Sequence, residues 1–170
     1  MNLIVPYAVG HADPRRTLQA GTRAVGEKFC ARFVLMTTDT SYWELFEELW
    51  AAEDDFVVVE QDVVPTDELI QSMWECREPW CSTELGQLGC VKFGSIRQQI
   101  PDLMARASKK VPSHSFELVD SGLTLVLVSE LGLSPHLHHP SPIHMHPPMT
   151  DEQAARARGM QGPVWPEGSR

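Results

Sequence analysis

The sequence is poor in positive charge. Its 170 residues include 14 lysine and arginine residues against 23 aspartate and glutamate residues, which gives a formal net charge of −9. Proteins that grip a nucleic-acid backbone generally show a basic patch, and the pairs Arg15-Arg16 and Lys109-Lys110 are too small to form one. Bulk nucleic acid is therefore not an expected partner. An acidic protein can still bind a phosphate-bearing ligand through a divalent cation.

Long hydrophobic runs are also missing. A membrane-spanning helix needs roughly 20 consecutive apolar residues, and the longest run, near residues 123–128, is only the length of a strand. The N-terminal residues lack the basic stretch that opens a signal peptide. We therefore expect no membrane span and a cytoplasmic location, where the four cysteines would be reduced.

Several motifs of common enzyme classes are absent from the sequence. It contains no Walker loop, no GxGxxG and no GxSxG, so neither a P-loop, a Rossmann dinucleotide site nor a hydrolase nucleophile is indicated. Cys76, Cys81 and Cys90 are not spaced like the close pairs of zinc ribbons. We expect these cysteines to be buried small apolar residues, with metal ligation as the alternative.

The first half of the chain alternates between strand and helix patterns. Residues are 42% hydrophobic, and the length fits one domain. The expected order is a strand at 2–9, a helix at 17–29, a strand at 31–36, a helix at 42–52, a strand at 56–59 and a helix from 66 to about 76. This alternation predicts an α/β fold, with a mostly parallel central sheet and helices on both faces.

The pattern is less regular in the second half. We expect one or two short strands within 79–93, a helix at 95–107, a pair of helices or strands at 115–119 and 123–130, extended chain from 135, and a helix at 150–159 before a loose tail. The domain is accordingly assigned to residues 1–150, and the C-terminal helix and tail to 151–170.

Two carboxylates follow the apolar strand 56–59. Glu60 and Asp62 form an E-x-D triplet with Gln61. In an open α/β sheet, ligands bind beyond the carboxyl ends of the strands, and extended chain would place both carboxylates on one side. Two hard oxygen donors suit Mg²⁺ or Mn²⁺, which can bridge to a diphosphate. The alternative is that both are ordinary solvated turn residues.

Five of the seven histidines lie within eleven positions near the C-terminus, at 136, 138, 139, 144 and 146. In extended chain His144 and His146 share one face. One of these imidazoles could complete a divalent-metal site begun by Asp62. The alternative is that these five histidines have no function and simply lie in a proline-rich loop.

Two further residues are candidates for substrate chemistry. Asp120 precedes a glycine in FELVDSG and could act as general base on an acceptor hydroxyl. Trp80 lies between Pro79 and Cys81 and could stack on a sugar or base. The alternatives are an exposed turn aspartate and a core tryptophan.

Together these segments resemble a known family. The runs YWELFEELWAAEDDFVVVEQDVVPTDELIQSMWECREPWC, LGCVKFGSIRQQIPDLM, ELVDSGL and PHLHHPSPIHMHPP are similar to small GT-A-like glycosyltransferases of actinobacteria and their phages. The resemblance extends from about Leu3 to His146, and its most specific part is the strand, E-x-D and helix followed by PWC and LGC. It implies a GT-A-like, Rossmann-like single domain that binds a nucleotide-diphospho-sugar donor with Mn²⁺ or Mg²⁺ and transfers the sugar to an unknown acceptor.

The resemblance also implies roles for individual residues. Glu60 and Asp62 would hold the metal together with His144 or His146, and Asp120 would be the catalytic base. The donor would be bound by Pro6, Tyr7 and Asp39 as well as by the triplet 60–62, Gln61 included. Trp80, Cys81 and Gly89, from the PWC and LGC segments, are the candidate substrate-binding residues.

Some alternatives stay open. The triplet reads EQD where the larger family has DxD, so a GT-A-like module that binds a nucleotide or nucleotide sugar without turnover is the second hypothesis. A metal-binding interaction protein built on the histidine-rich segment is the third. The sequence does not decide whether the chain forms a homodimer.

Overall fold

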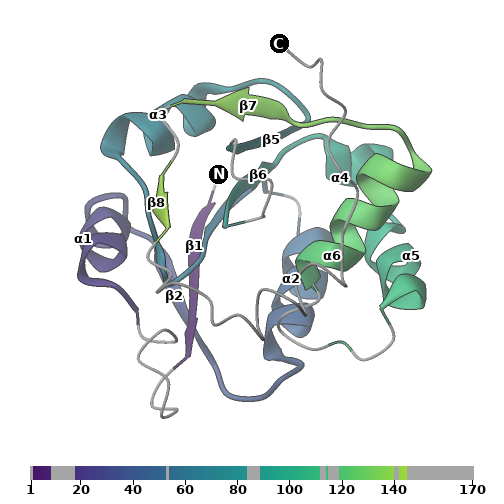
Figure 1. The fold of residues 1–170 in the computed structure, drawn as a ribbon, viewed down its shortest axis with the longest axis horizontal. Coiled ribbons are helices and arrows are strands. Elements are labelled where there is room, and N and C mark those ends of the chain that lie inside the picture. The colour runs from purple at the N-terminus through teal and green to yellow at the C-terminus, as the bar shows by residue number, and fades with distance from the viewer. Residues whose placement is uncertain are drawn as a thin grey trace, which may run out of the picture.

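A six-stranded sheet, in the order β2-β1-β3-β6-β5-β7, runs through the described part of the protein (Figure 1). The computed structural model describes residues 2–8, 18–52, 54–83, 89–111, 114, 119–139 and 142–144, with backbone alone at 120, 121, 143 and 144. The strands are β1 (Asn2–Ala8), β2 (Arg32–Met36), β3 (Phe56–Val59), β5 (Trp80–Thr83), β6 (Cys90–Phe93) and β7 (His136–His138). A separate ribbon pairs β4 (Val63–Val64) with β8 (Ile143–His144).

The sheet is mixed. β1 is parallel to β2 and β3, and β5 is parallel to β7, whereas β6 is antiparallel to both β3 and β5. The register aligns Val59 with Cys90 and Thr83 with His138. As a result, the carboxyl ends of all the strands except β6 meet at one edge of the sheet, which we call the carboxyl edge, and β6 begins there.

Helices cover both faces of the sheet, as the strand and helix alternation predicts (Figure 1). α1 (Ala20–Lys28) and α3 (Asp67–Glu75) lie on one face. The other face is covered by α2 (Ser41–Ala51), α4 (Ile96–Gln99), α5 (Leu103–Lys110), α6 (Val119–Thr124) and the π-helical segment η3 (Leu125–Glu130). Two apolar cores result, one on each face, so the described residues form one α/β domain.

The central strand β3 explains why there are two cores. All four of its residues are buried, and side chains alternate between the faces of a strand. Phe56 and Val58 belong to the core beneath α2 and α5, while Val57 and Val59 belong to the core beneath α3. The continuous apolar run that identified this strand in the sequence is therefore what a strand covered on both faces requires.

Three expectations for the second half need correction or completion. The helix expected at 95–107 is broken: α4 ends at Gln99 and α5 begins at Leu103, because Pro101 cannot continue a helix and disfavours helical backbone at Ile100. The pair expected at 115–119 and 123–130, for which the sequence permits either helix or strand, is helical at residues 119–130, the part that the structure describes. The helix expected at 150–159 and the tail lie outside the described residues.

Helix α3 begins as its sequence predicts. The Thr66 hydroxyl accepts a hydrogen bond from the Leu69 amide at 3.2 Å, and Asp67 and Glu68 lie in the first turn, where the helix dipole favours negative charge. We expect Thr66→Ala to lower the free energy of unfolding by about 1 kcal/mol in a urea titration, because an amide of the first turn loses its partner. Thr66→Ser keeps the hydroxyl and serves as the control. Equal losses in both variants would contradict the capping role.

Within the part of the chain that the structure describes, no helix is both long enough and apolar enough to cross a membrane.

Candidate functional site

The acidic triplet lies at the carboxyl edge, immediately after β3. The Glu60 amide donates to the Gly89 carbonyl at 2.9 Å, which continues the β3–β6 pairing by one step. The Tyr42 hydroxyl, from the first turn of α2, donates to Glu60 Oε1 at 3.1 Å. A Cβ atom at Gly89 would lie 2.8 Å from Val63 Cγ2 and 3.7 Å from Glu60 Oε2. The structure thus brings Glu60, Gly89 and Tyr42 together.

The chain turns at the triplet instead of staying extended. The Val63 amide donates to the Glu60 carbonyl at 3.1 Å, so residues 60–63 form a turn before β4 begins. The prediction that extended backbone places both carboxylates on one side is therefore wrong in its geometry. Asp62 occupies the second half of this turn and is 9% exposed.

Gln61 connects β1 and the start of α1 to the turn that follows β3. Its side-chain Oε1 accepts a hydrogen bond from the Ala8 amide, at the end of β1, at 2.7 Å. Its backbone carbonyl accepts from the Gln19 amide, just before α1, at 2.9 Å, and nearby the Thr22 hydroxyl of α1 donates to the Val63 carbonyl at 2.8 Å. Gln61 is 5% exposed. The middle residue of the triplet therefore fixes the turn that positions Asp62 relative to β1 and α1.

We expect Gln61→Ala to lower the free energy of unfolding by about 1–3 kcal/mol, because the partly buried Ala8 amide loses its acceptor. Urea denaturation followed by far-UV circular dichroism measures the change. Gln71→Ala, at an exposed position of α3, is the control and should change stability by less than about 0.5 kcal/mol. If Gln61→Ala were as stable as this control, the hydrogen bond from Ala8 to Gln61 would not stabilise the fold.

The ribbon of β4 and β8 brings one of the predicted histidines to the triplet. In its register Val63 is the partner of His144, so the His144 backbone lies beside the residue that follows Asp62. The His144 side chain is outside the description, and His146 lies outside the described residues altogether. This pairing joins two segments that are about eighty positions apart in the sequence.

The predicted nucleotide-binding residues follow the neighbouring strands. Pro6 and Tyr7 are near the end of β1, with Pro6 buried and Tyr7 half-buried. Asp39 is exposed in the turn after β2. Because Ala8 is the partner of Met36, these residues lie at the same carboxyl edge as the triplet.

Trp80 and Cys81 are not brought to this edge. Trp80 is the partner of Phe93, which in turn is the partner of Phe56, so it lies level with the first residue of β3. Its side chain is 4% exposed and belongs to the core beneath α2. Cys81 is fully buried on the opposite face. Of the three candidate substrate-binding residues, Gly89 alone is next to the triplet.

Asp120 lies in the first turn of α6, whose backbone the structure gives, while its side chain is outside the description. Asp120 therefore lies in a helix and not in the turn that was the alternative interpretation. Gly122 permits this packing, since a Cβ there would lie 2.7 Å from Val111 Cγ2, at the end of α5.

A second group of polar side chains, not recognised as a unit in the sequence, lies beside α3. Cys76, His136 and His138 each offer a ligand atom, and these atoms all lie within 4.8 Å of one another. Burial and the neighbouring His136 and Lys92 lower the pKa of His138. The signal that could have found this group is the His-x-His pattern on one strand together with the nearby cysteines. Cys90, by contrast, is packed in the apolar core beneath α3, and burial raises its pKa to about 12.

The described surface also has an open hollow of about 440 Å³, lined by Trp50, Ala52, Arg97 and Gln98. Arg97 donates to the Ala52 carbonyl and lies 3.7 Å from an Asp55 carboxylate oxygen, just before β3 begins. This hollow is at the amino end of β3, away from the triplet. We base the candidate site on the carboxyl edge, where the strand ends and their polar residues converge.

Comparison with known proteins supports a class of fold. No protein-family model matches the sequence, and no curated protein matches it significantly. Among solved structures, the chain is similar to the crystal structure of a glycosyltransferase involved in the glycosylation of the major capsid of PBCV-1. The likeness has a TM-score of 0.53 at 10% sequence identity and covers 94% of this chain and 99% of the other. The chain therefore has the fold of a glycosyltransferase.

Proposed function

We propose that the protein is a metal-dependent glycosyltransferase that moves a sugar from a nucleotide-diphosphate donor to an acceptor. The observation that carries this proposal is the position of the triplet 60–62 at the carboxyl edge of a fold that is similar to a glycosyltransferase over nearly its whole length. In open α/β sheets this edge is where ligands bind.

The donor set at this edge fits a hard divalent cation. Asp62 and Glu60 supply carboxylate oxygens, the ligands that Mg²⁺ and Mn²⁺ prefer, and the backbone of His144 is paired next to them. We propose that Asp62, Glu60 and His144 hold the ion, with His146 as the alternative histidine. A bound ion would neutralise the negative charge that develops on the diphosphate leaving group.

Other residues at the edge would position the reactants. The Tyr42 hydroxyl fixes one oxygen of Glu60, and Gly89 leaves space beside the other. Tyr7, near the end of β1, and Asp39, in the turn after β2, would bind the base and ribose of the donor. As the acceptor oxygen bonds to the anomeric carbon and the bond to the diphosphate breaks, Asp120 would take the acceptor's proton.

The test is turnover. Release of nucleoside diphosphate from a panel of nucleotide sugars should require Mn²⁺ or Mg²⁺ and should stop when EDTA is added. In Asp120→Asn, turnover should fall by about 100-fold or more, in the range that general-base catalysis contributes, while donor binding persists. Metal-dependent binding without turnover in the wild-type protein would instead favour the module that binds a nucleotide sugar without transferring it. No binding of any donor would contradict both.

A further inference from the structure

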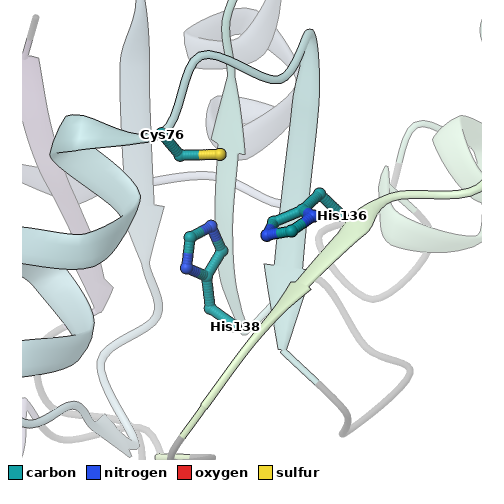
Figure 2. A group of neighbouring side chains, drawn as sticks. All are labelled: Cys76, His136 and His138. Carbon is teal, nitrogen blue, oxygen red and sulfur yellow. The ribbon is translucent and has the colours of Figure 1, made fainter. Parts of the chain in front are cut away.

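The strongest unexplained feature outside the carboxyl-edge site is the group of Cys76, His136 and His138 (Figure 2). Cys76 ends α3, and the two histidines lie two positions apart on β7, so they share one face of that strand. Their rings are 4.9 Å apart, and in Figure 2 both rings approach the Cys76 sulfur. The three ligand atoms lie within 4.8 Å of one another. A thiol and two imidazoles therefore converge on one point.

Ser72 determines which nitrogen of His138 is available. The Ser72 hydroxyl donates its one hydrogen to the Leu69 carbonyl at 2.9 Å, since a carbonyl can only accept. At its 3.0 Å contact with His138 Nδ1 the hydroxyl must then accept, so Nδ1 carries the ring hydrogen. The Nε2 atom is left with a lone pair. A histidine held by its other nitrogen in this way is the usual arrangement at metal sites.

The Nε2 atom of His138 is buried and has no hydrogen-bond partner among the described residues. The residue as a whole is only 8% exposed. Buried polar atoms are normally paired, and an unpaired one calls for a ligand or an ion. The atom faces the same point as the Cys76 sulfur (Figure 2).

A second thiol lies next to the first. Cys81 Sγ is 3.1 Å from Cys76 Sγ, and Cys81 is fully buried. In the parallel pairing of β5 and β7, Cys81 is the partner of His136, so the two side chains share a face. Cys81 is therefore the candidate for the fourth ligand of a tetrahedral site.

The surrounding charges accommodate a cation held by thiolates. The group lies at the C-terminus of α3, where the helix dipole favours positive charge. The buried Lys92 ammonium donates to the Cys76 carbonyl, and it would repel a cation that arrived without anionic ligands. Two cysteine thiolates balance a divalent ion, so the lysine does not oppose its binding.

We propose that Cys76, Cys81, His136 and His138 form a structural Zn²⁺ site. Thiolate and imidazole ligands favour Zn²⁺ over the hard cations Mg²⁺ and Mn²⁺, and two of each make a closed tetrahedral set without an open position for catalysis. The site is therefore chemically distinct from the oxygen donors at residues 60–62, and its existence does not depend on the proposed transferase activity.

Zinc at this position would stabilise β7, the outermost strand of the sheet. β7 is the outermost strand beside β5, and the four ligands join it to both β5 and the end of α3. The chain continues from β7 to β8, which pairs with β4 directly after Asp62. Zinc would thereby stabilise β7, the strand from which the chain continues to His144 at the carboxyl edge.

The test uses the full-length, untagged protein, reduced with a phosphine and stripped of metal, with its four thiols confirmed by titration. Co²⁺ serves as the spectroscopic probe. One equivalent should produce sulfur-to-cobalt charge-transfer bands and the visible spectrum of a tetrahedral site, and one equivalent of Zn²⁺ should remove both. At a hundredfold excess over its dissociation constant, Zn²⁺ should raise the melting temperature by roughly 5–10 °C.

Matched variants identify the ligands. Cys76→Ser and His136→Asn should lose the tetrahedral cobalt spectrum and the thermal shift. His136 is exposed, so its replacement tests the site without disturbing the core. Cys30→Ser and His139→Asn, at exposed positions outside the group, should behave like the wild-type protein. Absence of thiolate bands in the wild-type protein, or their persistence in Cys76→Ser, would overturn the proposal.

Discussion

Replacing Asp62 with asparagine is expected to weaken metal-dependent binding of a nucleotide-sugar donor by about 100-fold or more. The substitution keeps the size of a side chain that is only 9% exposed, so the turn at residues 60–63 should persist. It removes a negatively charged oxygen ligand, and hard divalent cations depend on such ligands. Titration calorimetry with Mn²⁺ present measures the affinity directly.

The matched control is Asp102→Asn. Asp102 is exposed before α5, and its side chain makes no capping hydrogen bond, so this variant removes one negative charge without touching the carboxyl edge. Its donor affinity should equal that of the wild-type protein. If Asp62→Asn also bound donor normally, Asp62 would not be a metal ligand.

The largest expected effect on stability comes from Phe56→Ala. Phe56 is completely buried at the start of β3, and its ring centroid lies 5.4 Å from that of Phe93, 6.2 Å from Phe46 and 6.5 Å from Trp50. Truncation removes the ring shared by these contacts and leaves a cavity that rigid neighbours cannot fill. We expect the free energy of unfolding to fall by about 3–5 kcal/mol in a urea titration.

Leu35→Ala is the comparison for this effect. Leu35 is 45% exposed on β2, the strand at one edge of the sheet, so its truncation creates no enclosed cavity. The loss there should stay below about 1 kcal/mol. If Phe56→Ala lowered the free energy of unfolding by no more than Leu35→Ala, the aromatic cluster around Phe56 would not be the centre of the core.

The elements of the first half could be predicted because their signals are local. The four apolar residues of β3 predict a buried strand, and the cap at Thr66 predicts the start of a helix, each from a few neighbouring positions. The break between α4 and α5 is equally local, since Pro101 excludes the continuous helix that the pattern at 95–107 favours. Local chemistry therefore decides where these elements begin and end.

The order of the strands depends on contacts that the sequence does not display. The reversal of β6 places Gly89 beside Glu60, and nothing in the local pattern indicates that β6 enters between β3 and β5. The same pairing carries Trp80 to the opposite end of the sheet from the triplet. Its place in a proline-flanked segment suggested a surface position, whereas the tertiary contacts bury it.

Only part of the candidate site could be predicted, because the rest of it also depends on tertiary contacts. The position of residues 60–62 after a buried strand was sufficient to place them at the carboxyl edge. The turn at Gln61 and its bond to Ala8 required knowledge of where β1 ends in space. The Cys76, His136 and His138 group could not be predicted because α3 and β7 are about sixty residues apart in the sequence and come together only in the folded protein, where Ser72 contacts His138.

The most direct test of the central claim is calorimetric titration of the wild-type protein with a panel of nucleotide-diphospho-sugars, each with and without Mn²⁺. At least one donor is expected to bind when Mn²⁺ is present, and binding should be lost when EDTA removes the ion. Donor binding of equal strength without any divalent ion would contradict this claim.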